Sequence, residues 1–232
     1  MSAKRVMMVM LVIAGVSFLA SLGLWQLSRA QQKQHLLETF TARTQAIPFT
    51  LSTIPSTADE ARFFRLQLTG RFDNQHVILL DNKTYGGKIG YEVYTPFISK
   101  EIAILVDRGF VEIGPSRQVL PRIRALPNLT TLTGLIDAPP KSVAFGPMRD
   151  TPKSLFPARL EFINLTALAK ELGYPLAPFI VKMDRKDPRA YPLTWQSNTL
   201  SPERHLGYAA QWFALAITLL ILCVTCHLHK KN

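Results

Sequence analysis

Two stretches of about twenty residues, one near each end of the chain, contain no charged side chain. They are residues 6–28 and residues 206–226, and both consist mostly of Leu, Val, Ala, Ile and Met. At a rise of about 1.5 Å per residue, a helix of this length crosses a hydrocarbon core of about 30 Å. We therefore predict two transmembrane helices, at residues 6–28 and 205–226.

The first apolar segment has an alternative interpretation as a cleaved signal peptide, because Lys4 and Arg5 supply a charged start. Its apolar run is longer than the hydrophobic part of most signal peptides, and no A-x-A cleavage pattern follows it. Trp25 is suitably placed to anchor the helix at a membrane interface. These features favour an uncleaved helix.

The flanking charges predict the orientation of both helices. Lys4 and Arg5 precede the first helix and Lys230 and Lys231 follow the second, so residues 1–5 and 227–232 are expected to be cytoplasmic. Only five residues precede the first apolar run, which leaves no room for an Arg- and Ser-rich transit peptide. We predict a multi-pass protein of the bacterial inner membrane, with both termini cytoplasmic and residues 29–204 in the periplasm.

The chain is strongly basic, with a net charge of +11 from 27 Lys and Arg against 16 Asp and Glu. Only four of the basic residues lie in the two tails, so the region between the helices is basic as well. A basic domain beside a membrane predicts contact with anionic membrane lipids. Nucleic acid is the other usual partner of such charge, but no recognition motif is present and the domain faces the wrong compartment.

Residues 29–204 begin with helical periodicity and then change to a period of two. Apolar residues three to four positions apart extend the first helix to about Phe40, and the Pro- and Ser-containing stretch 48–55 ends it. Asn164 and Gly173 are suitable caps for a helix at residues 165–172. Strands are expected at residues 65–69, 76–80, 91–97, 102–111, 129–136 and 179–183, with a turn at Gly86 and Gly87.

Strands at such short intervals predict an antiparallel sheet or a small barrel. The Pro- and Arg-rich residues 184–203 are expected to return the chain to the membrane in an extended form. The predicted fold class is membrane α+β, in which two transmembrane helices flank one β-rich periplasmic domain. Both cysteines lie in the second apolar run, so this domain contains no disulfide.

The β-rich region contains no Gly-rich phosphate loop, no G-x-S-x-G elbow and no cluster of histidines or carboxylates at metal-binding spacing. The histidines of this region, His35 and His76, are isolated, so neither is expected to be a metal ligand. A possible binding site lies instead at the start of the second apolar helix. There, His205, Tyr208 and Trp212 occupy positions i, i+3 and i+7, which share one helix face. An imidazole and two aromatics at a membrane boundary suit a flat ligand such as haem, or an aromatic interface belt.

A second motif is Cys223-Val-Thr-Cys226-His227, which has the C-x-x-C-H pattern of covalent haem c attachment. The motif lies at the expected cytoplasmic end of a membrane helix, whereas haem c is attached on the exported side. Two small side chains at i and i+3 are also ordinary in membrane helix packing. A membrane-anchored electron carrier or metallochaperone that uses Cys223, Cys226 and His227 is the alternative function.

Four stretches of the chain resemble, in the same order, the Surfeit-locus family of cytochrome c oxidase assembly factors. Residues 22–29, Leu-Gly-Leu-Trp-Gln-Leu-Ser-Arg, resemble the end of that family's first membrane helix. Residues 90–96, Gly-Tyr-Glu-Val-Tyr-Thr-Pro, and 105–111, Leu-Val-Asp-Arg-Gly-Phe-Val, resemble its two central motifs. Residues 204–216, Arg-His-Leu-Gly-Tyr-Ala-Ala-Gln-Trp-Phe-Ala-Leu-Ala, resemble its second membrane helix.

The chain also departs from that family at a few positions. The family commonly has Asn where Asp107 stands and Trp where Phe110 stands. Glu203 and Arg204 replace a usual pair of asparagines before the histidine. These differences leave the resemblance intact, and no role is carried over from the family to the residues around Asp107.

The resemblance implies a bacterial assembly factor and not an enzyme. Such a factor binds partly made subunit I of a haem-copper oxidase, together with other oxidase assembly factors, and helps haem a reach it. A scaffold that binds oxidase subunits without a cofactor is a further alternative. Arg29 and Arg108 can pair with haem propionates or simply reach lipid headgroups. The implied haem site comprises His205 as ligand of the haem iron, Tyr208 and Trp212 as pocket walls, Trp25 and Gln26 from the neighbouring helix, and Arg29 beside a propionate.

Overall fold

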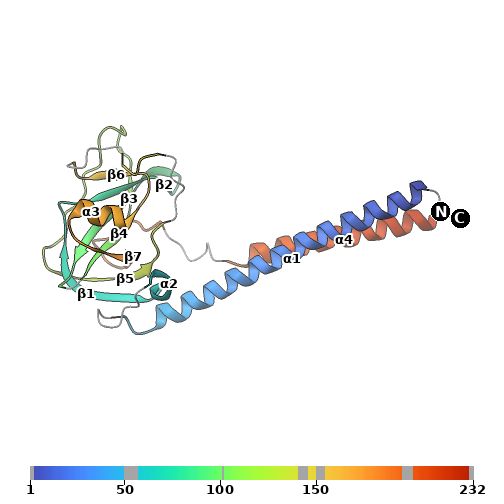
Figure 1. The fold of residues 1–232 in the computed structure, drawn as a ribbon, viewed down its shortest axis with the longest axis horizontal. Coiled ribbons are helices and arrows are strands. Elements are labelled where there is room, and N and C mark those ends of the chain that lie inside the picture. Colours follow the sequence, from blue (N-terminus) through green and yellow to red (C-terminus); the bar gives the residue numbers. More distant parts are fainter. Residues whose placement is uncertain are drawn as a thin grey trace. The chain divides into compact units, whose positions relative to one another are not determined.

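The computed structural model describes residues 3–49, 57–100, 102–140, 146–149, 155–194 and 201–229. The chain divides into two compact units. The helical unit combines residues 1–40 with residues 197–232, and the β unit consists of residues 41–196. Figure 1 shows the two long helices of the first unit and the sheet of the second.

The helical unit consists of most of α1 (Ala3–Gln45) and all of α4 (Glu203–His229), which lie antiparallel. Glycines on α1 allow the two helices to approach closely. A Cβ atom added at Gly23 would lie 2.7 Å from the ring of Phe213, and one added at Gly15 would lie 3.1 Å from Leu219. Small residues at the contact are the usual means by which apolar helices associate where the hydrophobic effect is weak.

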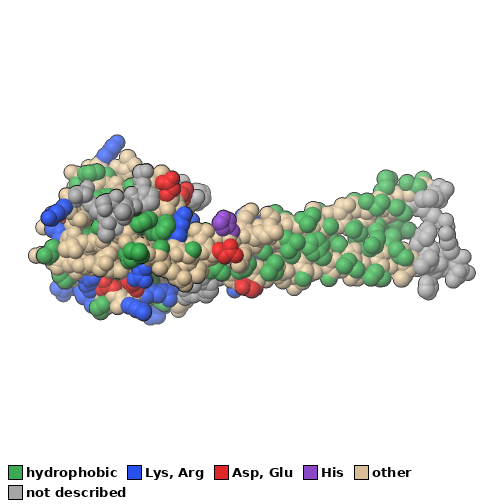
Figure 2. Space-filling model, turned by 90° about the horizontal axis from the view of Figure 1, so that it is seen from below, with side chains coloured by type: hydrophobic (Ala, Val, Ile, Leu, Met, Phe, Trp, Pro, Cys, Tyr) green, Lys and Arg blue, Asp and Glu red, His purple; other side chains and the backbone are tan. Residues whose placement is uncertain are grey.

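The side of α4 that faces α1 follows a seven-residue repeat. Ala209 and Ala216 are buried, as is Ala30 on α1, and this spacing gives a continuous seam along paired helices. The remaining surface of the pair is largely apolar and exposed, as the hydrophobic side chains along the helical unit in Figure 2 show. Both helices are long and apolar enough to cross a membrane. Two apolar helices that flank a β-rich domain were predicted, and this arrangement is confirmed.

The described residues of the β unit form one sheet of seven strands, in the order β1-β5-β7-β4-β3-β2-β6. Strand β1 also pairs with β3, through Arg71 with Ile98 and Phe72 with Phe97. This pairing closes β1, β5, β7, β4 and β3 into a ring, and β2 and β6 extend from it. The strands are β1 (Arg65–Phe72), β2 (Ile78–Tyr85), β3 (Lys88–Ile98), β4 (Ala103–Glu112), β5 (Thr130–Asp137), β6 (Ala158–Leu160) and β7 (Leu176–Met183).

The ring confirms the small barrel, while the other expectation, an antiparallel sheet, holds for most of the described pairings but not for two of them. Two of the described pairings, β4 with β7 and β2 with β6, are parallel. Parallel neighbours need a long connection between them. Here the chain passes through β5, β6 and α3 (Leu165–Leu172) before β7 enters between β4 and β5. Sequence periodicity reports which residues alternate, but it does not report the order in which strands pair.

Local capping explains why α3 begins and ends where the sequence predicted. The side chain of Asn164 accepts a hydrogen bond from the amide of Ala167 at 3.0 Å, and Gly173 adopts a left-handed conformation with φ of 79°. Two short elements, α2 (Ala58–Ala61) and β6, were not predicted, because three or four residues are too few to show a period. Residues 50–56, which include most of the stretch expected to end the first helix, lie outside the described part.

The apolar residues of the ring strands fill its interior. Leu66, Phe97, Ile104, Leu132 and Val181 come from five different strands, and all are fully buried in one cluster. A second cluster joins Leu168 of α3 to β2, β4, β6 and β7. The helix therefore covers an outer face of the sheet, while the ring has its own core.

Two glycines in the sheet lie where neighbouring backbones come too close for any side chain. A Cβ atom at Gly134 of β5 would lie 2.3 Å from the carbonyl oxygen of Lys182, and one at Gly90 of β3 would lie 2.2 Å from that of Val111. Backbone oxygens cannot move aside as the end of a flexible side chain can. These positions therefore fix the distances between β5 and β7 and between β3 and β4.

Replacement of Gly134 by Ala is expected to lower the free energy of unfolding of the β unit by about 1–3 kcal/mol, because the new methyl group overpacks the sheet. Urea unfolding of the full-length protein in detergent, followed by near-ultraviolet circular dichroism of tyrosines, measures this. Gly114→Ala is the matched control, since its Cβ would have 3.8 Å to the nearest atom. Equal stability of the two variants would contradict the close approach at Gly134.

Candidate functional site

His205 lies in the first turn of α4, next to α1. The helix starts at this point because the carbonyl oxygen of Pro202 accepts hydrogen bonds from the amides of His205 and Leu206, at 3.0 and 3.1 Å. The Nδ1 atom of His205 lies 2.8 Å from Oε1 of Gln26 on α1. An amide oxygen can only accept, so in the neutral imidazole Nδ1 carries the proton and Nε2 keeps the lone pair. This is the arrangement in which a second group fixes the tautomer of a metal-binding histidine.

Two further side chains of the expected site lie on α1 beside Gln26. The guanidinium of Arg29 lies 5.8 Å from the ring centroid of Trp25, and its Nη1 donates to Oε1 of Gln32 at 3.0 Å. Both Arg29 and Trp25 are exposed. A guanidinium is suited to bind a carboxylate through two parallel hydrogen bonds. The end of the helical unit that carries His205 thus combines an imidazole, an amide, an indole and a cation.

The structure separates the three residues of α4 that were expected on one face. His205 and Trp212 are partly buried and lie on the same stripe as Ala209 and Ala216, the side that faces α1. Tyr208 lies off this stripe, and 52% of its surface is exposed. The described residues therefore bring His205 together with Gln26, while Tyr208 points to the outer side of the helix.

The cysteine motif lies within one continuous helix, because α4 extends to His229. Cys223 is partly buried, Cys226 is exposed, and both thiols are free. The side chain of His227 lies outside the described part. No group of three or more His, Cys, Asp or Glu that could hold a metal ion occurs among the described residues.

Arg108 does not lie at the end of either apolar helix. Its side chain is fully buried in the β unit, where Nη2 donates to the carbonyl oxygen of Arg124 at 2.7 Å and the guanidinium lies 5.2 Å from the Tyr191 ring centroid. Burial lowers the pKa of Arg108 to about 10. Both roles considered for Arg108, propionate pairing and contact with headgroups, are therefore wrong. Arg108 instead holds two irregular segments against β4.

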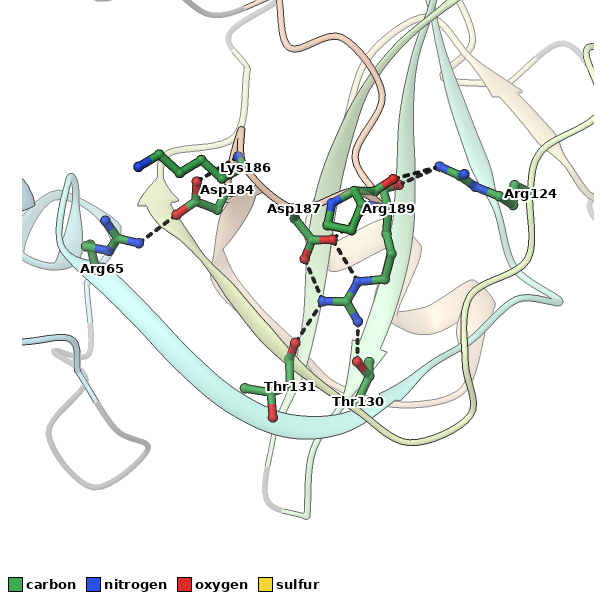
Figure 3. Close-up of polar contacts among 9 residues, drawn as sticks. Arg65, Arg124, Thr130, Thr131, Asp184, Lys186, Asp187 and Arg189 are labelled. Atoms are coloured by element: carbon green, nitrogen blue, oxygen red, sulfur yellow. Dashed lines mark hydrogen bonds and ion pairs between the residues drawn. The ribbon is translucent and has the colours of Figure 1, made fainter.

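The basic residues of the segment that follows β7 also hold that segment in place, as Figure 3 shows. Nε of Arg189 donates to Oδ1 of Asp187 at 2.8 Å, and Nη2 donates to the carbonyl oxygen of Thr131 at 2.9 Å. The Arg189 guanidinium holds the pKa of Asp187 below its ordinary value. Arg65 forms an ion pair with Asp184 at 2.6 Å. These two arginines therefore attach residues 184–189 to the barrel.

A polar cavity of about 330 Å³ in the β unit was not predicted from the sequence. Asp137 lies in its wall and accepts hydrogen bonds from Nε of Arg62 and Nζ of Lys182, each at 2.7 Å. Glu92 and Tyr94 of β3 line the same cavity. The available signal was the presence of Glu92 within the otherwise apolar run 91–97, where a charge must have a partner if the strand is buried.

Comparison with known proteins adds to this geometry. Residues 13–217 match the SURF1 family, which covers the chain from within α1 to within α4. The chain belongs to the SURF1 family. Its resemblance to the Surfeit-locus proteins, first seen in four short stretches, is thereby confirmed.

Relatives in this family come from bacteria and eukaryotes. The chain is 27% identical over 221 residues to a SURF1-like protein of Rickettsia conorii, covering 92% of this chain and 88% of the relative. It is 26% identical over 225 residues to Surfeit locus protein 1 of Xenopus tropicalis, covering 88% and 70% respectively. A SURF1-like protein of Monosiga brevicollis is 27% identical over 214 residues, with 85% and 79% covered.

Replacement of Gln26 by Leu is expected to release the tautomer of His205. Loss of one hydrogen bond worth about 0.5–1.5 kcal/mol should change the tautomer ratio about 2–10-fold towards the form protonated at Nε2. Nitrogen-15 NMR of histidine-labelled full-length protein in lipid nanodiscs measures the two ring nitrogens directly. Gln32→Leu is the control. Gln32 accepts a hydrogen bond from Arg29, so its replacement should leave His205 unchanged. An unaltered His205 spectrum in Gln26→Leu would show that Gln26 does not set the tautomer.

Proposed function

We propose that this SURF1-family chain is a membrane-anchored assembly factor for a haem-copper cytochrome c oxidase and not an enzyme. The observation that carries the proposal is the contact of His205 with Gln26 at the boundary end of two paired apolar helices. This contact leaves the lone pair of Nε2 free in the neutral imidazole, and a nitrogen with a free lone pair can bind haem iron. Membership of the family and the apolar surface of the helical unit support an action within a membrane.

The proposed cargo is haem a, and the residues present suit it. Haem a supplies an iron that takes a nitrogen ligand and propionates that carry negative charge. His205 provides the nitrogen, and Arg29 provides a planar cation for a carboxylate. Trp25 and Trp212 offer aromatic surface, and Gln26 orients the imidazole. Tyr208 belongs to the proposed site only as an outer residue, because it is exposed on another side of α4.

The proposed partners are subunit I of the oxidase and other oxidase assembly factors. The outer faces of α1 and α4 present exposed apolar side chains such as Phe18, Leu24, Leu215 and Ile217. In a membrane these faces contact lipid or a neighbouring apolar helix. Haem transfer requires the acceptor to approach the end of the helical unit that carries His205, so we assign contact with subunit I to this end. Contact between the basic β unit and anionic lipids forms part of the same proposal.

We further propose that both termini are cytoplasmic and that the β unit is periplasmic in a bacterial inner membrane. The antiparallel pairing of α1 and α4 supports this topology, because it brings the first residues of α1 and the last residues of α4 to the same end of the helical unit. The sequence has Lys4 and Arg5 at the start of the chain and Lys230 and Lys231 near its last residue. Their positive charge favours the cytoplasmic side.

His205→Ala is expected to leave the amount of protein normal but to remove most of its haem a, because the variant lacks the iron ligand and loses little buried surface. Oxidase yield should fall with it. Trp212→Ala should reduce the haem content less, since it removes only aromatic contact. The measurement is acid-acetone extraction and pigment identification from protein purified out of cells that make haem a. Tyr85→Ala, a change in the β unit, is the control for nonspecific loss.

Each result of that extraction separates the proposed function from its alternatives. A full haem complement in His205→Ala would show that His205 is not the ligand. Haem that resists extraction and stays on the chain in a denaturing gel would indicate the covalent carrier that uses Cys223 and Cys226. Absence of haem from the wild-type protein, with oxidase assembly still dependent on it, would indicate a scaffold without cofactor.

The topology can be measured independently of haem. A reporter that is active only in the periplasm should work when inserted in the exposed Gly86-Gly87 turn and should fail when fused after Asn232. A reporter that is active only in the cytoplasm should give the opposite pattern. Activity of the periplasmic reporter at the C-terminus would contradict the proposed orientation.

A further inference from the structure

The polar cavity of the β unit is lined by several parts of the chain. Strand β3 contributes Glu92 and Tyr94, β7 contributes Lys182, and two segments, 59–62 and 137–140, supply further lining residues. The volume of about 330 Å³ lies within the range of about 300–1,000 Å³ that is usual for small-molecule sites. Carboxylate, hydroxyl and cationic groups converge on this space, so the cavity suits a small polar ligand.

The segment that carries Asp59 and Arg62 is held in place by its own hydrogen bonds. Nη1 of Arg43, near the end of α1, donates to the carbonyl oxygens of Asp59 and Arg62 at 3.2 and 2.8 Å. The amide of Phe63 donates to the carbonyl oxygen of Ile136 on β5 at 2.8 Å. These bonds fix the backbone on this side of the cavity before any ligand binds, and a preformed wall lowers the cost of binding.

Most hydrogen-bond donors at the cavity wall are already used within the protein. Nε of Arg62 and Nζ of Lys182 each donate to Asp137 at 2.7 Å, so both cations lie beside a carboxylate. The hydroxyl of Tyr94 donates to Oε2 of Glu92 at 3.0 Å. Burial raises the pKa of Tyr94 well above its ordinary value, so this hydroxyl keeps its proton for Glu92 and can only accept from a ligand.

The groups that remain for a ligand are mainly acceptors. The two oxygens of Glu92 each accept one hydrogen bond, from Tyr94 and from Thr194, and a carboxylate oxygen has room for a second. The carboxylate of Asp59 is exposed and has no hydrogen bond or ion pair among the described residues. Residues 139 and 140 are both proline, so their backbone has no N–H group and can only accept. A ligand that donates hydrogen bonds therefore fits this wall.

The charges that face the cavity favour a cation. The lining includes three carboxylates but only two cations, which leaves one negative charge in excess. Outside the lining, Nζ of Lys83 lies 3.9 Å from Oε2 of Glu92, which is beyond the distance of a hydrogen bond, so the carboxylate keeps lone pairs for a ligand. The part of the chain that the structure describes has no group of three or more His, Cys, Asp or Glu that could hold a metal ion. The cation that suits this cavity is therefore organic.

We propose that this cavity binds a small, free organic cation through a primary ammonium group. The N–H donors of such a group match the acceptor atoms of Asp59, Glu92 and Tyr94, and its positive charge compensates the excess carboxylate. The site is independent of the haem site and of the proposed function, because every residue that carries it belongs to the β unit. Failure of one proposal therefore leaves the other intact.

Two probes of equal size and opposite charge test the ligand class. Full-length protein in nanodiscs of zwitterionic lipid is titrated with propylammonium and with propionate, and saturation-transfer NMR gives each dissociation constant against empty nanodiscs. Propylammonium should bind about tenfold more tightly or better, because a hydrogen bond to a charged group contributes at least this factor. Tetramethylammonium, which has the charge but no N–H group, should bind more weakly than propylammonium. Equal binding of propylammonium and propionate, or no binding of propylammonium, would overturn the proposal.

Asp59→Asn locates the site, because this exposed side chain has no described partner whose loss would disturb the fold. The dissociation constant for propylammonium should rise about two- to fivefold, which is the loss expected for one exposed ion pair. Glu60→Gln is the matched control. It removes the same charge from the neighbouring exposed residue, which does not line the cavity, and it should bind propylammonium as the wild type does. Equal weakening in the two variants would show attraction by net charge alone and would contradict the assigned site.

The folding equilibrium gives a second measurement that needs no variant. A ligand that binds only the folded chain raises the folding constant about elevenfold when its concentration is ten times the dissociation constant. Urea unfolding of the full-length protein in nanodiscs is compared in propylammonium chloride and in sodium propionate at equal ionic strength. The unfolding midpoint should be higher in propylammonium chloride. Identical midpoints in the two salts would overturn the proposal.

Discussion

Close approach of backbones at glycine is the constraint on which much of this structure depends. At Gly90 and Gly134 the neighbouring strand leaves no room for a Cβ atom, and at Gly23 the partner helix occupies that space. At Gly109, with φ of 101°, a Cβ would lie 2.6 Å from the carbonyl oxygen of Tyr191. These contacts set the spacing of the barrel strands and of the helix pair. They also bring the segment after β7 against β4, where the backbone amide of Tyr191 donates to the carbonyl oxygen of Arg108 at 2.6 Å.

Buried charge is the second organising feature of the β unit. Arg108, Glu92 and Asp137 are each held by named partners from distant parts of the chain, and burial raises the pKa of Asp107 well above its ordinary value. A buried ion pair contributes little net stability, but removal of one partner is costly because the other is left uncompensated. Each of these groups therefore specifies which segment packs where. Tyr191 and Thr194 are attached in this way, close to the end of the β unit.

The helical unit uses the same principle with a single polar contact. His205 and Gln26 meet in a mostly apolar helix pair, where an unpaired imidazole or amide would be unfavourable. The contact fixes the relative position of α1 and α4 along their axes and also fixes the ring nitrogen that His205 presents. One hydrogen bond thus positions both the two helices and the imidazole ring.

The sequence by itself determined the elements that depend on local pattern. The apolar runs, the Asn164 and Gly173 caps, the Gly86-Gly87 turn and the main strands follow from residues that are neighbours in the chain. The order of motifs also indicated the family. Only the tertiary structure decided the parallel pairing of β7 with β4, the burial of Arg108 and the outward position of Tyr208, because these depend on contacts between distant segments. Asp107 shows the difference: in the sequence it is an aspartate where the family commonly has asparagine, and in the fold its carboxyl group is buried, accepts a hydrogen bond from the amide of Gly109 and has a pKa that burial raises well above the ordinary value.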